Sequence, residues 1–139
     1  MEKQTVQRHW EMCDRQTRGG RWAAFHVTMS KRGIIAVSRF TLEVLGRPEA
    51  FHLLFDRLNS TIGLQPAKNH LDNAYPTAAR GIHGAKTVRA WPLMQQFGIN
   101  LAQTVRFIDP KIEDGILLLD LRKVLPVGAL SSKKRGSGV

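Results

Sequence analysis

Few of the residues in this sequence that could carry out catalysis or bind a metal have the spacing that such chemistry needs. The acid pair Glu113-Asp114 falls in a predicted turn without a catalytic partner, and Cys13 is the single cysteine. The five histidines are scattered without metal-ligand spacing: His9, His26, His52, His70 and His83. No glycine-rich segment has the context of a phosphate-cradling loop. We therefore expect no enzyme activity, no cofactor and no metal site.

Positive charge is the strongest chemical feature of the chain. Its 139 residues hold 21 Lys and Arg against 11 Asp and Glu, a formal net charge of +10. An excess of this size favours a polyanionic partner, with nucleic acid ahead of anionic lipid. The alternative that stays open is a charge that serves only solubility.

The positive charge is unevenly distributed along the sequence. Residues 1–32, 66–90 and 122–139 carry the excess, whereas residues 33–65 are balanced and residues 91–121 are net acidic. The most apolar segments are thus neutral or acidic. A partition of this kind favours a binding role over an even solubilising charge.

Length and hydropathy indicate one globular domain. The chain is 42% hydrophobic, enough for a core, yet no apolar run reaches the roughly 18 residues needed to cross a bilayer. The N-terminus is polar and lacks the apolar region of a signal peptide. We expect a cytoplasmic protein that does not enter a membrane.

The pattern of apolar residues predicts a mainly β protein with short helices (α+β). Short helices are expected over 38–45, with Ser38 as N-cap and Gly46 as stop, and over 91–97, with Pro92 in the first turn. Strands are expected at 21–30, 34–37, 50–56, 60–66, 86–90, 103–109 and 115–121, with turns at 31–33, 57–59 and 110–114. Residues 66–85 are predicted to be a connection with one irregular strand near Tyr75 to Ile82.

The two halves of the chain share this order of elements. Placing Gly46 on Gly98, an offset of 52 residues, also pairs Leu42 with Met94 and Phe55 with Phe107. A preserved order with few identities is what an old internal duplication leaves.

The pattern KRG, IIAVS, RFTLEVLG, RPEAFHLLFD, RLN, STIGLQP resembles the SpoVT/AbrB DNA-binding family. Val37-Ser38 and Glu43 stand where that family commonly has Ile-Pro and a basic residue. The resemblance implies two AbrB-like units in one chain, as in MraZ-like proteins, forming a pseudo-twofold swapped-hairpin β-barrel.

The resemblance further implies that basic side chains from the strand-to-strand turns of both units, brought to one side by the pseudo-twofold, contact DNA. It assigns that role to Lys31, Arg32, Arg80, Lys86 and Arg89. Arg39 joins them if it faces outward from the helix start, and Arg18 and Arg21 of the arm would add non-specific phosphate affinity.

The expected organisation is a basic N-terminal arm at 1–20, a first AbrB-like unit at 21–67, a connection and second unit at 68–124, and a basic flexible tail at 125–139. Double-stranded DNA is the expected partner, for a transcriptional regulator associated with the nucleoid. RNA binding, a protein-interaction accessory role and a further homo-oligomer stay open.

Overall fold

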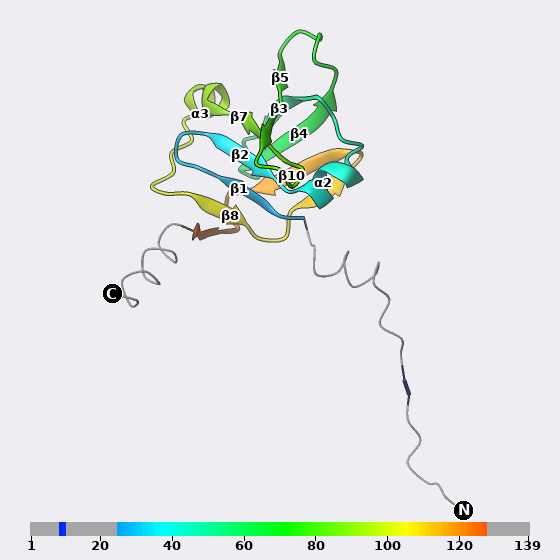
Figure 1. Cartoon of the computed structure of the whole chain (residues 1–139). Helices are drawn as coiled ribbons and strands as arrows, with labels where there is room; N and C mark the ends of the chain where they lie inside the picture. Colours follow the sequence, from blue (N-terminus) through cyan, green and yellow to red (C-terminus); the bar gives the residue numbers. More distant parts are fainter. Residues whose placement is uncertain (1–8, 11–24, 128–139) are drawn as a thin grey trace, which may run out of the picture.

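The computed structural model describes residues 9–10 and 25–127 and contains two antiparallel sheets (Figure 1). The six-stranded sheet, called sheet A, has the order β11-β8-β1-β2-β7-β6. Its strands are β1 Val27–Met29, β2 Ile34–Val37, β6 Ala78–Arg80, β7 Ala85–Arg89, β8 Val105–Phe107 and β11 Val124–Pro126.

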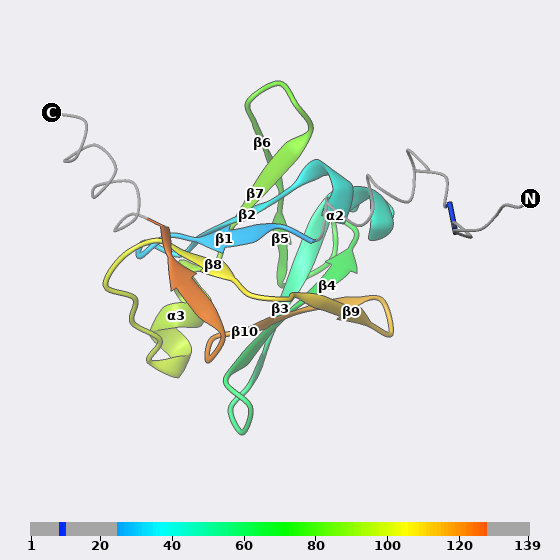
Figure 2. The ribbon, with the colours of Figure 1, turned by 90° about the horizontal axis from the view of Figure 1, so that it is seen from below.

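The five-stranded sheet, called sheet B, has the order β5-β3-β4-β10-β9. Its strands are β3 Ala50–Asp56, β4 Thr61–Ala67, β5 Ala74–Pro76, β9 Lys111–Glu113 and β10 Ile116–Asp120. The two helices of the described residues, α2 Arg39–Val44 and α3 Trp91–Phe97, lie at opposite ends of the described part of the chain (Figures 1 and 2). The mainly β fold class with short helices is confirmed.

Local sequence explains where both helices begin and end. The Ser38 hydroxyl accepts a hydrogen bond from the backbone N–H of Thr41 at 3.4 Å and caps α2. Pro92 stands in the first turn of α3, where its missing N–H costs nothing, and Gly98 ends α3 in the left-handed conformation. Both helices have six or seven residues, so their stability depends on packing against the sheets.

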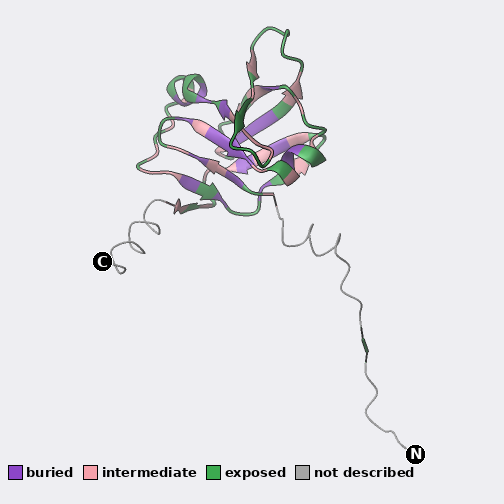
Figure 3. Ribbon diagram, viewed as in Figure 1, coloured by how far each residue is buried: buried purple, intermediate pink, exposed green. Residues whose placement is uncertain are grey.

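The hydrophobic core lies between the two sheets. Ile35 and Val37 of sheet A are buried in one cluster with Ile62 and Leu117 of sheet B, and α3 adds Leu93. Buried residues alternate along β1, β8 and β10, as expected when one face of a strand meets the core. The central strand β2 is buried over three successive residues. Figure 3 shows buried residues along the strands in the middle of the molecule and exposed residues on the helices and hairpin loops.

Strand pairing joins the two halves of the chain in both sheets. β2 pairs with β7 at the centre of sheet A, and β4 pairs with β10 near the centre of sheet B. The inner order is therefore β1-β2-β7-β6 in one sheet and β3-β4-β10-β9 in the other. In each sheet a hairpin of the first half lies beside a hairpin of the second half.

Two glycines form reciprocal contacts between the halves. A Cβ added to Gly33, in the β1–β2 turn, would lie 2.7 Å from the backbone nitrogen of Trp91 at the start of α3. A Cβ added to Gly84, in the β6–β7 turn, would lie 2.9 Å from the side chain of Arg39 at the start of α2. Each hairpin turn thus packs against the first residue of the helix from the other half.

Several finer expectations are wrong. No closed barrel forms in the described residues, because β11, β6, β5 and β9 remain as the four edges of two separate sheets. Residues 110–114, predicted as a turn, contain β9, which pairs with β10. The connection at 66–85 holds two short strands, β5 and β6, one in each sheet.

The second half also departs from the first after its helix. Phe55 lies in β3 of sheet B, whereas Phe107, its expected equivalent, lies in β8 of sheet A. Asp109, with a φ of 55°, and Pro110 interrupt the strand there, and the chain then enters sheet B as β9. Leu125 and Pro126, expected in the tail, pair with β8 as part of β11.

The Gly33 contact leads to a stability prediction. Gly33→Ala should lower the free energy of unfolding by at least about 1 kcal/mol more than Gly46→Ala, as measured by urea denaturation. Both glycines have a φ of +87°, so the left-handed strain of alanine is matched. Only Gly33 faces backbone atoms, since nothing lies within 4 Å of a Cβ on Gly46. Equal losses would show that the contact with α3 contributes nothing.

Candidate nucleic-acid interface

The two sheets differ in charge. The strands of sheet A contain Arg80, Lys86, Arg89 and Arg106 and no Asp or Glu. The strands of sheet B contain three acids and one cation: Asp56, Glu113, Asp120 and Lys111. The positive charge on the strands therefore belongs almost entirely to one sheet.

Strand alternation shows which side chains of sheet A point away from the core. Val88 is buried, so Thr87 and Arg89 lie on the opposite face of β7. Val105 and Phe107 are buried on either side of Arg106, which is exposed. We call this surface the outer face of sheet A.

The middle of the outer face is lined by small side chains. The register pairs Arg106 with Thr28, Thr28 with Ala36, Ala36 with Thr87, and Thr87 with Ala78. These residues form one row across five strands, with an arginine at one end. Thr28 and Thr87 are half-buried and Ala36 is 9% exposed, so the middle of the row presents only small side chains.

Two arginines and a tryptophan meet at one end of the β2–β7 pair. Arg32, Ile34, Arg89 and Trp91 line an open depression, and Ile34 and Arg89 are paired in the sheet. Trp91 is 48% exposed, which is unusual for so large an apolar side chain. The arrangement places two guanidinium groups and an indole at one surface. We call it the Arg32–Arg89–Trp91 cluster.

Backbone contacts hold this cluster together. The β1–β2 turn, which carries Arg32, is hydrogen-bonded to the start of α3 because the N–H of Ala90 donates to the carbonyl of Gly33 at 2.7 Å. The Ser30 hydroxyl accepts the N–H groups of Arg32 at 3.3 Å and Ile34 at 3.1 Å. Since Arg89 directly precedes Ala90, this hydrogen bond fixes the position of the β1–β2 turn relative to the end of β7.

Guanidinium groups and an exposed aromatic ring suit an anionic ligand. Among the described residues, no carboxylate lies within ion-pair distance of Arg32 or Arg89. Two arginines without an acidic neighbour attract phosphate, and an indole offers a surface for stacking or apolar contact.

The predicted cations do not form a single group. Lys31 and Arg32 are exposed in the β1–β2 turn, and Arg89 lies next to that turn. Lys86 pairs with the buried Val37 and lies on the core-side face of β7, half-buried. Arg18 and Arg21 lie outside the described residues.

Arg80 and Arg39 lie at the other end of the β2–β7 pair. The expectation that both hairpin turns lie on one side is wrong, because antiparallel pairing of β2 with β7 sends the two turns to opposite ends. Arg80 is exposed beside the β6–β7 turn. Arg39 is ion-paired with Glu43 at 2.9 Å, so part of its charge is neutralised.

Sequence reasoning missed Arg106 and Trp91. Arg106 belongs to the net-acidic segment 91–121, and only its position between Val105 and Phe107 indicated an outward-facing cation on a strand. In the sequence, Trp91 indicates only the first residue of a helix. No local pattern indicated that Trp91 would lie beside Arg32, which is distant in sequence.

His26 extends β1 beside the outer face. Its carbonyl accepts the N–H of Ser38 at 3.0 Å, and its own N–H donates to the Thr41 hydroxyl at 3.2 Å. Desolvation of the imidazole, followed by the positive charge of Arg106, lowers the pKa of His26 below its usual value. These surroundings therefore favour the neutral form of the His26 imidazole.

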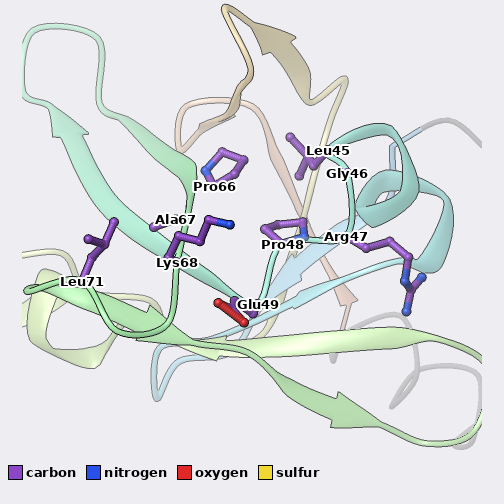
Figure 4. Close-up of a pocket in the computed structure, with 9 residues that line it drawn as sticks. All are labelled: Leu45, Gly46, Arg47, Pro48, Glu49, Pro66, Ala67, Lys68 and Leu71. Carbon is purple, nitrogen blue, oxygen red and sulfur yellow. The ribbon is translucent and has the colours of Figure 1, made fainter.

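The sheet B side offers no comparable cationic surface. Arg122 donates to both carboxylate oxygens of Asp120 at 3.0 Å, and these bonds lower the pKa of Asp120. A second depression runs between the α2–β3 and β4–β5 connections, where Arg47 points away from the other lining side chains (Figure 4). Glu49 there accepts the N–H of Asn69 at 3.0 Å. This depression lacks convergent cations.

The described residues contain no group of three or more His, Cys, Asp or Glu side chains that could hold a metal ion. Within the same part of the chain, no helix is long and apolar enough to span a membrane. Comparisons with protein-family models, with curated proteins and with solved structures gave no match.

The pKa of His26 predicts how stability depends on pH. The unfolded chain, with an ordinary histidine, binds a proton near pH 6.5, whereas the folded protein does so only at lower pH. Stability from neutral His26 is thus fully present above about pH 6.5 and is lost as the pH falls through the lower folded-state pKa. Urea denaturation at about pH 7.5 and pH 5.5 should show a larger loss for the natural protein than for His26→Gln.

Arg106→Gln provides the companion measurement. Removing this cation should raise the His26 pKa toward its usual value, as followed by NMR titration of the imidazole. An unchanged titration would leave desolvation as the sole cause.

Proposed function

We propose that this protein binds double-stranded DNA through the outer face of sheet A and acts as a transcriptional regulator. The observation that carries the proposal is the charge difference between the sheets, because the strands of sheet A have four cations, three of them exposed on the outer face (Arg80, Arg89 and Arg106), and no acids. DNA presents one negative charge per about 1.7 Å of helix axis, so an acid-free cationic face suits it.

The proposed contacts follow the placement of the exposed cations. Arg32 and Arg89 would bind phosphates at one end of the face, Arg106 at the far side of the small-residue row, and Arg80 near the β6–β7 turn. Lys31 lies beside Arg32 and would add charge. Phosphate contacts of this kind position a duplex and make affinity strongly salt-dependent.

The proposal includes an origin by duplication, with two AbrB-like units in one chain. Three observations support it. The strand orders β1-β2-β7-β6 and β3-β4-β10-β9 are symmetric in the two halves. The 52-residue offset maps β2 onto residues 86–89 of its own partner, β7. The reciprocal contacts of Gly33 and Gly84 relate the hairpin turns in the same way.

The remaining parts of the proposal concern the ends of the chain and the cell compartment. The arm, with Arg18 and Arg21, and the basic tail would add affinity that is independent of DNA sequence. A DNA-binding regulator of this kind would lie in the cytoplasm, associated with the nucleoid.

RNA is the second candidate ligand, favoured by one observation. Trp91 is half-exposed beside Arg32 and Arg89, and an aromatic side chain among arginines is suited to stacking on an unpaired base. Binding measured with duplex DNA, single-stranded DNA and single-stranded RNA of equal length separates the two. Tighter binding of RNA than of duplex DNA at all salt concentrations would replace the DNA proposal.

A salt series with charge-removing variants tests the interface. The double variant Arg32→Gln/Arg89→Gln should bind duplex DNA more weakly and should lower the slope of log affinity against log salt by about 2, one for each lost phosphate contact. Fluorescence anisotropy of a labelled duplex measures both quantities.

The matched control removes two charges from the sheet B side. Lys68 follows β4, and Lys111 lies in β9, so Lys68→Gln/Lys111→Gln changes the net charge equally. This control should retain the salt slope of the natural protein. Equal losses in the two double variants would show that affinity comes from net charge alone, and absence of binding at low salt would overturn the proposed function.

A further inference from the structure

Two hairpins project from opposite sides of the molecule, and each carries an exposed aliphatic residue at its tip (Figure 2). Ile82, in the β6–β7 turn, is 91% exposed, and Leu58, in the β3–β4 turn, is 93% exposed. A side chain of this size loses about 2 kcal/mol or more of burial free energy when it stays in water. Packing within the described residues does not explain either position.

The surroundings of the two tips differ. Ile82 lies in the turn of a sheet A hairpin, next to the exposed Arg80 and the exposed His83. Leu58 belongs to sheet B, next to Asp56, whose carboxylate accepts the side-chain N–H of Asn59 at 2.7 Å. The second tip also carries Arg57, whose guanidinium lies 5.0 Å from the centre of the Phe97 ring, so a cation and an acid stand together there. Residues 80–84 around Ile82 include no acid, which makes the first tip the better match for a phosphate backbone.

The β6–β7 hairpin is narrow. Its ladder pairs Ala78 with Thr87, Ala79 with Lys86, and Arg80 with Ala85, so most of its side chains are small. Gly81 and Gly84, with φ of +69° and +91°, flank Ile82 and His83 at the apex. A slender ribbon with an aliphatic tip and flanking cations has the shape that enters a DNA groove.

The turn of this hairpin contacts the start of α2. The Arg39 side chain packs against Gly84, where an added Cβ would lie 2.9 Å from it, and Glu43 holds Arg39 through a 2.9 Å ion pair. A side chain that separates stacked base pairs has to resist the force that restacks them. The contact with α2 supplies that support.

We propose that Ile82 inserts between base pairs from the minor groove and bends the duplex. The proposal rests on the DNA binding proposed above and assigns a mechanical role to a residue outside the cationic contacts. Aliphatic side chains inserted in this way unstack a base step and bend the duplex by about 20–90° toward the major groove.

A bend at the tip would allow the duplex to contact both ends of β7. From Ala85 to Arg89, β7 runs about 13 Å at about 3.3 Å per residue, with the tip beyond one end and the Arg32–Arg89–Trp91 cluster at the other. A bent duplex can contact both ends of this span, and the extra phosphate contacts offset the cost of unstacking.

Bending is measured by energy transfer between dyes on the two ends of a duplex of about 30 base pairs. The natural protein should shorten the end-to-end distance, and Ile82→Ala should bind with less than about tenfold loss of affinity but without the shortening. Leu58→Ala is the matched control, equally exposed on a hairpin tip, and should bend DNA as the natural protein does. Thermal melting checks that both variants fold.

A duplex with a two-nucleotide mismatch at its centre gives a second reading. Because the mismatched bases are already unstacked, insertion of Ile82 is no longer needed to unstack them. Ile82→Ala and the natural protein should therefore bind the mismatched duplex with equal affinity. Binding without bending by the natural protein, or full bending by Ile82→Ala, would overturn the proposed insertion of Ile82 while leaving the proposed function in place. Absence of duplex binding by every protein would overturn both.

Discussion

The antiparallel pairing of β2 with β7 is the interaction on which the rest of the arrangement depends. Without it, sheet A would separate into β11-β8-β1-β2 and β7-β6, each with a new unpaired edge. The pairing also places Arg89 opposite Ile34 and therefore beside the β1–β2 turn. The same direction of pairing sends the β6–β7 turn, with Ile82, to the other end. The Arg32–Arg89–Trp91 cluster and the projecting hairpin are thus two consequences of one strand register.

The separation of charge depends on where the chain crosses between the sheets. Arg106 is the middle residue of β8 in sheet A, and Asp109 follows in the crossing to β9. Asp120 ends β10, and Arg122, two residues later, is bonded to it before the chain re-enters sheet A as β11. Residues that are neighbours in sequence and opposite in charge therefore lie on different faces or neutralise each other. A sum of charges over segment 91–121 hides Arg106 for this reason.

Local patterns were sufficient for the elements but not for the connections between them. The β2 strand follows from a short apolar run and the β3–β4 hairpin from alternation. Both helices follow from a serine cap, a proline and glycine stops, each of which acts within a few residues. The sheet to which a strand belongs is decided by long-range packing, so the placement of Phe107 in sheet A and the existence of β9 and β11 could not be read from the sequence. For the same reason the cations were identified by type, while the proximity of Arg32 to Arg89 and the inward-facing side of Lys86 required the register.

The reciprocal packing of the two hairpin turns on the two helices creates two similar ends, yet the side chains at those ends are different. At one end Gly33 meets Trp91 and the cluster contains two arginines; at the other Gly84 meets Arg39, whose charge is shared with Glu43. Both turns have four residues, but the turn at the second end is more exposed, with Ile82 at its apex. A symmetric surface would bind a duplex equally in two orientations. Because one end concentrates positive charge and the other presents an aliphatic tip, the two ends of the outer face of sheet A are not equivalent. In the proposed complex, a duplex would be held at the arginine end and deformed at the isoleucine end.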